Sequence, residues 1–137
     1  MPTPFGPRDH TITAELSRLK EARDFAEAAA REFGLDDDDS YQVKLAMSEA
    51  VANAIQHGSA SASDPIKLHA VEEAGELVLY VTDTGRFVPR VSPRGEFPER
   101  GRGLEFMSLI MDAVEVRPGP NGTVLRFAKR RSEQPVA

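Results

Sequence analysis

Hydrophobic and polar positions follow two different rhythms along this chain of 137 residues. In residues 17–33 and residues 40–57, apolar side chains recur every three or four positions, which is the spacing of one face of an α-helix. Residues 66–73 alternate between apolar and polar side chains, and residues 77–81 are almost continuously apolar between turn signals, as strands are. The pattern predicts two amphipathic helices followed by two consecutive strands.

Further signals predict the remaining elements. Residues 9–16 alternate like a strand, and residues 104–112 carry the apolar side chains of a short helix. Residues 114–127 are typical of two strands joined by the turn at residues 118–122. Strands that follow one another through short turns pair in the antiparallel sense. We therefore expect the α+β class, with helices packed on one face of a mixed, mainly antiparallel sheet.

Local signals mark the ends of the two long helices. Gly34 follows the first helix, and glycine is a common residue where a helix stops. The aspartates at residues 36–39, with Ser40, precede the second helix. Such an acidic run could hold a metal ion. We favour N-capping, because carboxylates are stabilised at the positive end of a helix macrodipole.

The chain has about the length of one domain. We expect residues 1–8, which contain three prolines, to form a flexible lead, residues 9–130 to form the domain itself, and residues 131–137 to form a flexible tail. Inside the domain, residues 86–102 contain three prolines and show no periodic pattern. A loop of this length is uncommon in a small domain and is usually functional or disordered.

Composition narrows the functional classes. The net charge is −5, from 17 basic and 22 acidic residues, which argues against nucleic acid as the main partner. No apolar run approaches the length of about 18 residues that a membrane-spanning helix needs. The first residues lack the basic start and apolar middle of a secretory signal. With no cysteine, the chain has no disulfide framework and no thiolate metal site. These features suit a cytoplasmic protein.

The first chemical signal is a pair of polar side chains in an otherwise apolar helical stretch. Glu49 and Asn53 are four residues apart, so they share one face of the second helix. A carboxylate can accept a proton from a nucleophile, and an amide oxygen can bind a hard cation such as Mg²⁺. Because the same spacing is common on solvated helix faces, it indicates a site only in combination with other signals.

The second signal is Asp83-Thr84-Gly85, directly after the strand at residues 77–81. A carboxylate at a strand end can accept a hydrogen bond from an exocyclic amine such as that of adenine, and a glycine lets a ring approach the backbone closely. Asp-x-Gly is also one of the commonest turn sequences. A simple turn therefore remains an alternative interpretation of this segment.

The third signal is Gly101-Arg102-Gly103-Leu104, at the start of the predicted short helix. Backbone N–H groups at a helix N-terminus can bind phosphate, and an arginine can add charge-assisted hydrogen bonds. Five arginines lie within residues 86–102. They could contact phosphate, but they could also be solvated or paired with neighbouring glutamates.

In this order, the three signals resemble those of the GHKL ATPase superfamily, which includes gyrase, histidine kinases and MutL. The resembling stretches are residues 45–58, 81–85, 101–116 and 121–123, and the similarity extends over about residues 9–130. Within the superfamily, the chain is most similar to the small bacterial anti-sigma factor serine/threonine kinases of the RsbW and SpoIIAB group.

The resemblance implies the nucleotide-binding (Bergerat) fold of this superfamily, in which ATP lies between a layer of helices and a lid. Residues 86–102 would be the lid. By position, Glu49 would be the general base that accepts the proton of a protein serine or threonine hydroxyl. Asn53 would bind the Mg²⁺ that bridges the phosphates.

The other two motifs would contact the rest of the nucleotide. Asp83 would bind the adenine amine, Gly85 would lie beneath the base, and Thr123 would lie near the adenine end. Residues 101–104 would hold the phosphates. Phe87 occupies a position at which the family often has a second glycine.

The leading hypothesis from this resemblance is a kinase that binds a sigma factor and uses ATP and Mg²⁺ to phosphorylate a STAS-type anti-sigma factor antagonist. The group also implies a homodimer that contacts neither nucleic acid nor a membrane directly. Two alternatives stay open. The chain could be an ATP-binding protein-interaction module without phosphotransfer, or a small ATPase in which Glu49 activates water.

Overall fold

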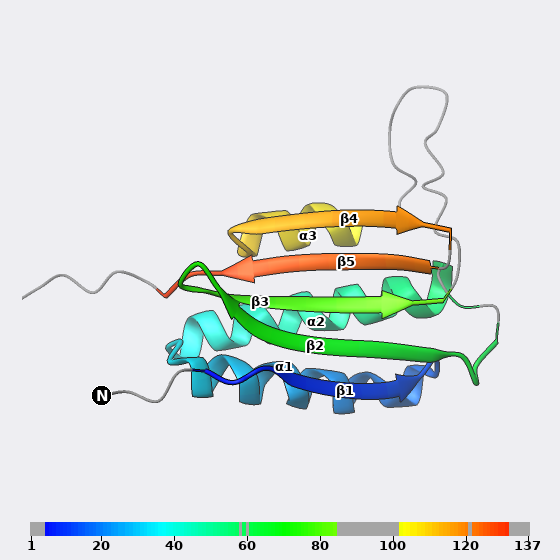
Figure 1. The fold of residues 1–137 in the computed structure, drawn as a ribbon, viewed down its shortest axis with the longest axis horizontal. Helices are drawn as coiled ribbons and strands as arrows, with labels where there is room; N and C mark the ends of the chain where they lie inside the picture. The colour runs from blue at the N-terminus through cyan, green and yellow to red at the C-terminus, as the bar shows by residue number, and fades with distance from the viewer. Residues whose placement is uncertain (1–4, 58, 60, 85–101, 121, 132–137) are drawn as a thin grey trace, which may run out of the picture.

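A computed structural model describes residues 5–57, 59, 61–84, 102–120 and 122–131 of the protein. Within these residues, five strands form one sheet, and the helices lie together on one face of it (Figure 1). The predicted α+β class, with helices covering one face of the sheet, is confirmed.

The sheet has the strand order β1-β2-β3-β5-β4, and each of the four strand pairs in the described residues is antiparallel. No parallel pair accompanies them in this part of the chain. Two of the four pairs, β2–β3 and β4–β5, are hairpins. Ala74 and Gly75, between β2 and β3, both have positive φ (51° and 80°), as a tight type I′ turn requires. The strands are β1 Arg8–Thr13, β2 Pro65–Glu73, β3 Glu76–Asp83, β4 Ala113–Gly119 and β5 Gly122–Lys129.

The helical segments are η1 Leu16–Arg18, α1 Leu19–Phe33, α2 Asp37–His57 and α3 Arg102–Ile110. Gly34 ends α1 in a left-handed conformation (φ 102°), and its N–H donates to backbone carbonyls of the last turn. At the start of α2, the Asp36 carboxylate accepts a hydrogen bond of 2.8 Å from the Asp39 N–H. The predicted stop at Gly34 and the capping role of the acidic run are confirmed, but α2 begins at Asp37, three residues earlier than predicted, so Asp37, Asp38 and Asp39 form its first turn. None of the helices in the described residues is long and apolar enough to cross a membrane.

The first strand is shorter than its alternating pattern predicts. It ends at Thr13, and Leu16 begins the 3-10 turn η1 with 61% of its surface exposed. The turn is closed by a hydrogen bond from the Arg18 N–H to the Glu15 carbonyl oxygen. The prediction of a strand up to residue 16 was therefore wrong. Alternation over three residues does not distinguish a strand end from a turn.

The core lies between the helices and the covered face of the sheet. The apolar stripe of α2 is fully buried there, and it shares one hydrophobic cluster with side chains of β2, β3 and β5. Burying a side chain of this size stabilises the fold by about 1.5–3 kcal/mol. The largest members are Phe33, Met47, Ile66, Leu68, Leu77, Leu79, Met107 and Phe127.

Helix α3 packs against α2 and runs in the opposite direction. Its start, at Gly103, lies against Glu49 and Asn53. Its end is tied to the first turns of α2 by Lys129, whose Nζ donates to the Ile110 carbonyl oxygen and to Gln42 Oε1, both at 2.6 Å. This packing sets the geometry of the candidate site.

Candidate functional site

Helix α2 presents Glu49 and Asn53 on one face, as their spacing predicts. Both side chains are half-buried, and both lie against Gly103, the second residue of α3. A Cβ atom built on Gly103 would lie 2.7 Å from Glu49 Oε2 and 3.5 Å from Asn53 Nδ2. The packing of α3 on α2 therefore brings the first and third predicted motifs into contact.

Asp83 and Thr123 are brought together by the pairing of β3 with β5. They are partners in the strand register, and the Thr123 N–H donates to Asp83 Oδ1 at 3.3 Å. Both residues are buried. Gly122 has a positive φ (140°), and any Cβ there would overlap the Asp83 carbonyl oxygen. Only glycine permits this close approach of the two strands.

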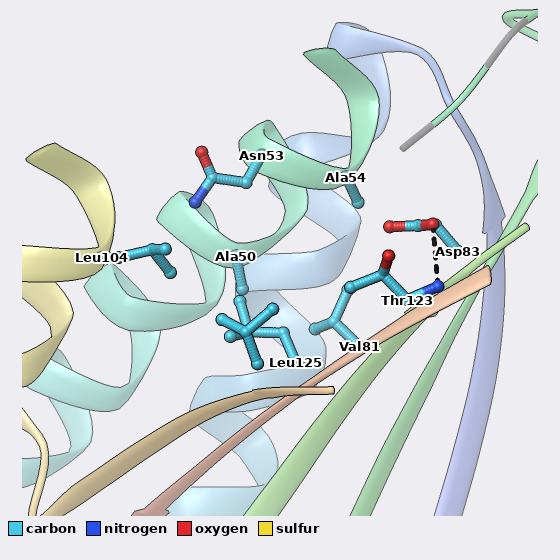
Figure 2. A pocket seen from close by; sticks show the side chains of 9 residues that line it. Ala50, Asn53, Ala54, Val81, Asp83, Leu104, Thr123 and Leu125 are labelled. Carbon is cyan, nitrogen blue, oxygen red and sulfur yellow. Dashed lines mark hydrogen bonds between the residues drawn. The ribbon is translucent and has the colours of Figure 1, made fainter. Parts of the chain in front are cut away.

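A pocket of about 320 Å³, which includes space open to solvent, is lined by Asn53 of the first pair and by both Asp83 and Thr123. Figure 2 shows Asn53, Asp83 and Thr123 around this space, with Ala50 and Leu125 on its apolar side. An apolar lining with a few convergent polar groups is typical of small-molecule sites. The pocket is lined from two helices and three strands by Ala50, Asn53, Ala54, Val81, Asp83, Leu104, Val116, Thr123 and Leu125.

The Glu49 carboxylate, which lies beside this pocket, has no basic partner among the side chains that the structure describes. The lysine of α2, Lys44, lies 3.7 Å from Glu27 of α1 and so points away from Glu49. The first turn of α3 lies next to the Glu49 carboxylate, and the partial positive charge of a helix N-terminus interacts favourably with an anion.

The structure places the other predicted site residues as follows. Leu104 lines the pocket, and Arg102 begins α3, although its side chain is not described. Gly85, Gly101 and the predicted lid up to residue 101 lie outside the described residues. Of the residues expected to contact a ligand, the structure brings together those from α2, β3, α3 and β5.

Five lining residues were not predicted as part of the site: Ala50, Ala54, Val81, Val116 and Leu125. Val116 and Leu125 are partners in the register of the β4–β5 hairpin. The turn at residues 118–122 was recognised in the sequence, so counting the pairs outward from it would have placed the two side chains next to each other. What the hairpin alone could not reveal is that this pair faces Asp83 rather than another part of the core.

Residues 12–129 match the family model of the histidine kinase-like ATPase domain. The chain belongs to this family. The predicted membership of the GHKL superfamily, and of its anti-sigma factor kinase group, is confirmed, and ATP binding follows from the family. The pocket described above is the place where the predicted motifs of this ATPase domain converge.

Two curated relatives show where in the family the chain lies. The anti-sigma F factor of Clostridium kluyveri is 33% identical over 101 residues, which cover 67% of this chain and 71% of the relative. The anti-sigma F factor of Thermoanaerobacter sp. (strain X514) is 28% identical over 136 residues, which cover 88% of this chain and 95% of the relative. The similarity to the second relative thus extends over almost the full length of both chains.

Solved structures share the fold at lower sequence identity. The RsbU and RsbW domains of Rv1364c from Mycobacterium tuberculosis match with a TM-score of 0.73 and 23% identity over 94% of this chain. The match spans only 33% of that longer chain. A blue-light activated histidine kinase from Erythrobacter litoralis matches with a TM-score of 0.61 and 21% identity over 96% of this chain and 43% of its own. These likenesses concern the fold alone.

Proposed function

We propose that the protein is an ATP-dependent anti-sigma factor, which binds a sigma factor and phosphorylates a serine or threonine of a STAS-type antagonist. The observation that carries the proposal is the position of the Glu49 carboxylate. It lies against the start of α3, beside the pocket that we assign to ATP, and none of the described lysine and arginine side chains pairs with it. The names of the curated relatives, anti-sigma F factors, support the regulatory part of the proposal.

In this proposal the buried end of the pocket binds adenine. Asp83 would accept a hydrogen bond from the exocyclic amine, and the Thr123 N–H holds one oxygen of that carboxylate in place. The apolar side of the pocket would contact the flat faces of the base, since Val81 and Leu125 line it. Gly85 would lie beneath the ring. Guanine presents a carbonyl oxygen in place of the amine, so an acceptor at this position favours adenine.

The polar residues on α2 and α3 fit a magnesium-bound triphosphate. The described residues contain no group of three acidic or histidine side chains that could hold a metal ion by themselves. Mg²⁺ is usually bound by one or two protein ligands together with substrate phosphates and water. A single amide, that of Asn53, fits this pattern, and residues 101–104 would supply backbone N–H groups and the Arg102 guanidinium to the phosphates.

Glu49 would act as the general base. Bound Mg·ATP supplies the phosphoryl group for transfer. The partner's hydroxyl oxygen would form a bond to the γ-phosphorus while the bond to the bridging oxygen breaks, and the hydroxyl proton would pass to Glu49. Catalysis of this kind depends mostly on positioning and charge stabilisation, which two packed helices provide better than a loop.

The test is to incubate the protein with labelled ATP, Mg²⁺ and candidate STAS-domain partners. The proposal expects label on a partner serine or threonine, and loss of that label in Glu49→Ala while nucleotide binding persists. Release of free phosphate without partner labelling would instead identify a small ATPase. Nucleotide binding with neither reaction would identify an interaction module.

The remaining parts of the proposal concern the state of the protein in the cell. We propose a cytoplasmic homodimer that contacts neither nucleic acid nor a membrane directly. The domain would extend over residues 9–130, with residues 86–102 as the lid. Sedimentation velocity at micromolar concentration tests the dimer, and limited proteolysis with and without Mg·ATP tests the lid by the protection of its arginines.

A further inference from the structure

Gly103 occupies a position at which no side chain fits without moving Glu49. A Cβ atom there would lie 2.7 Å from Glu49 Oε2 and 3.7 Å from Glu49 Cδ. Contacts shorter than about 3.0 Å to a Cβ are essentially absent from real proteins, because the two atoms overlap. The space between the first turn of α3 and the Glu49 carboxylate therefore cannot hold even one added methyl group.

Backbone conformation does not explain why residue 103 is a glycine. Gly34, Gly75 and Gly122 have positive φ angles, whereas Gly103 lies in regular helix and is not among them. Alanine is better than glycine inside a helix, because glycine loses more conformational freedom on folding. A helix that needed only to form would gain from alanine at this position. The structural reason for glycine is thus the contact with α2.

The group that would move is the carboxylate rather than the helix. Oε2 is the far end of a flexible side chain, so a new methyl group on α3 would turn Glu49 into another rotamer. The apolar contacts that hold α3, through the fully buried Met107, would remain. Substitution at Gly103 therefore perturbs the chemistry of Glu49 much more than it perturbs the fold.

We infer that Gly103 is a positioning residue, which sets the location of the Glu49 carboxylate by leaving room for it against the start of α3. The inference rests on the proposed function for the role of Glu49 as a base. It adds that the helix start assigned to phosphate binding also limits where the carboxylate of the base can lie.

The test is the Gly103→Ala variant. We expect the rate of phosphotransfer at saturating ATP to fall about 100-fold, the loss that a misplacement of about 1 Å can produce. The backbone N–H of residue 103 is kept in this variant, so ATP affinity should fall much less than the rate does, and the thermal midpoint should be no lower. Gly6→Ala is the matched control, because a Cβ there meets no atom within 4 Å, and it should leave all three quantities unchanged.

A double-mutant cycle separates positioning from a general structural effect. Glu49→Asp withdraws the carboxylate by one methylene group, so Gly103→Ala should have little further effect on phosphotransfer in that background. An equal loss in both backgrounds would overturn the inference, as would full activity of Gly103→Ala alone.

A crystal structure of nucleotide-free Gly103→Ala supplies a readout that does not depend on activity. The inference requires the carboxylate to leave the position seen here, and an unmoved carboxylate overturns it. If the wild-type protein transfers no phosphate to any partner, the proposed function fails. The crystallographic position of Glu49 then still decides whether Gly103 sets it.

Discussion

Each end of the α2–α3 contact has one acidic and one amide side chain on α2, but the groups that contact these side chains differ between the two ends. At one end, Asp39 and Gln42 of α2 face the last turn of α3, and Lys129 of β5 lies between them. Its Nζ is 2.6 Å from Gln42 Oε1 and 3.8 Å from Asp39 Oδ1, and the lysine and aspartate side chains are both only 12% exposed. The chain supplies its own cation at this end.

At the other end, Glu49 and Asn53 of α2 face the first turn of α3. None of the lysine and arginine side chains that the structure describes pairs with Glu49, and the contact on α3 is Gly103, which adds no side chain. A carboxylate and an amide on a helix are therefore not informative by themselves. They indicate a site where the fold leaves a space beside them, and they indicate a structural cluster where the fold fills that space with a buried charge.

The largest expected effect comes from Glu49→Gln, which keeps the size of the side chain and removes its basicity. Phosphotransfer to the partner should fall by about 10²–10⁴-fold, the usual contribution of a general base. The measurement is the rate of label transfer at saturating ATP. Glu105→Gln, on the exposed side of α3, should leave the rate unchanged. Equal rates in Glu49→Gln and wild type would remove Glu49 from its catalytic role.

The opposite end should respond in stability instead of chemistry. Lys129→Met removes the largely buried cation that lies 3.8 Å from Asp39 Oδ1, together with its two hydrogen bonds of 2.6 Å, and should lower the free energy of unfolding by about 3 kcal/mol. Chemical denaturation measures this value. Arg130→Met, one residue later and 70% exposed in its side chain, should change it by less than about 0.5 kcal/mol. A similar loss of stability in both variants would mean that the largely buried contacts of Lys129 do not contribute more than those of an exposed cation.

Removal of the amide at each end should separate binding from stability. Asn53→Ala should weaken Mg²⁺-dependent ATP binding about tenfold or more, or about 1.4 kcal/mol, with little change in unfolding. Gln42→Ala should instead lower the free energy of unfolding and leave Mg·ATP binding almost unchanged, because the Gln42 side-chain oxygen accepts a hydrogen bond from Lys129. Calorimetric titration with and without Mg²⁺ distinguishes them. Unchanged Mg·ATP affinity in Asn53→Ala would exclude it as a ligand.

The smallest effect should come from a polar cluster on the open face of the sheet, where solvent screens charges. The Tyr80 hydroxyl donates to Glu73 Oε2 at 2.5 Å, and this hydrogen bond, together with Arg126, holds the pKa of Glu73 below its ordinary value. Tyr80→Phe should therefore destabilise the protein by about 1 kcal/mol at neutral pH.

The pH dependence of this effect follows from the direction of the shift. A carboxyl with a depressed pKa in the folded state contributes stability above its unfolded pKa, about 4.3, and loses it as the pH falls through the folded pKa. The difference between wild type and Tyr80→Phe should shrink in acid. Denaturation curves recorded at pH 7 and below about pH 4, which is below the pKa of an unfolded glutamate, measure this difference in stability. A constant difference would mean that the ionised form of Glu73 is not involved.

Much of the fold was predictable because its signals are local. The Gly34 helix stop, the Asp36 cap and the turn at Ala74-Gly75 depend only on neighbouring residues, and all three were recognised. Where two local interpretations compete, the sequence did not decide between them. Leu16 continued an alternating pattern but lies in a turn, and Leu109, counted among the apolar residues of the short helix, is 83% exposed.

The candidate site divides in the same way. The spacing of Glu49 and Asn53 predicted that they share a face, because helix geometry is set by the backbone. Their contact with Gly103 could not be counted from spacing, since it depends on how α3 packs across α2. The apposition of Asp83 with Thr123 likewise depends on the register of β3 with β5.

The sequence by itself determined the elements, the family and the types of polar group available for chemistry, because each depends on residues close together in the chain. Only the tertiary structure decided which acid–amide pair meets a lysine and which meets a glycine. Those contacts join distant segments, and they arise from the burial of apolar faces against one shared sheet. One end of α2 therefore became part of the framework, while the other end was left beside an open pocket.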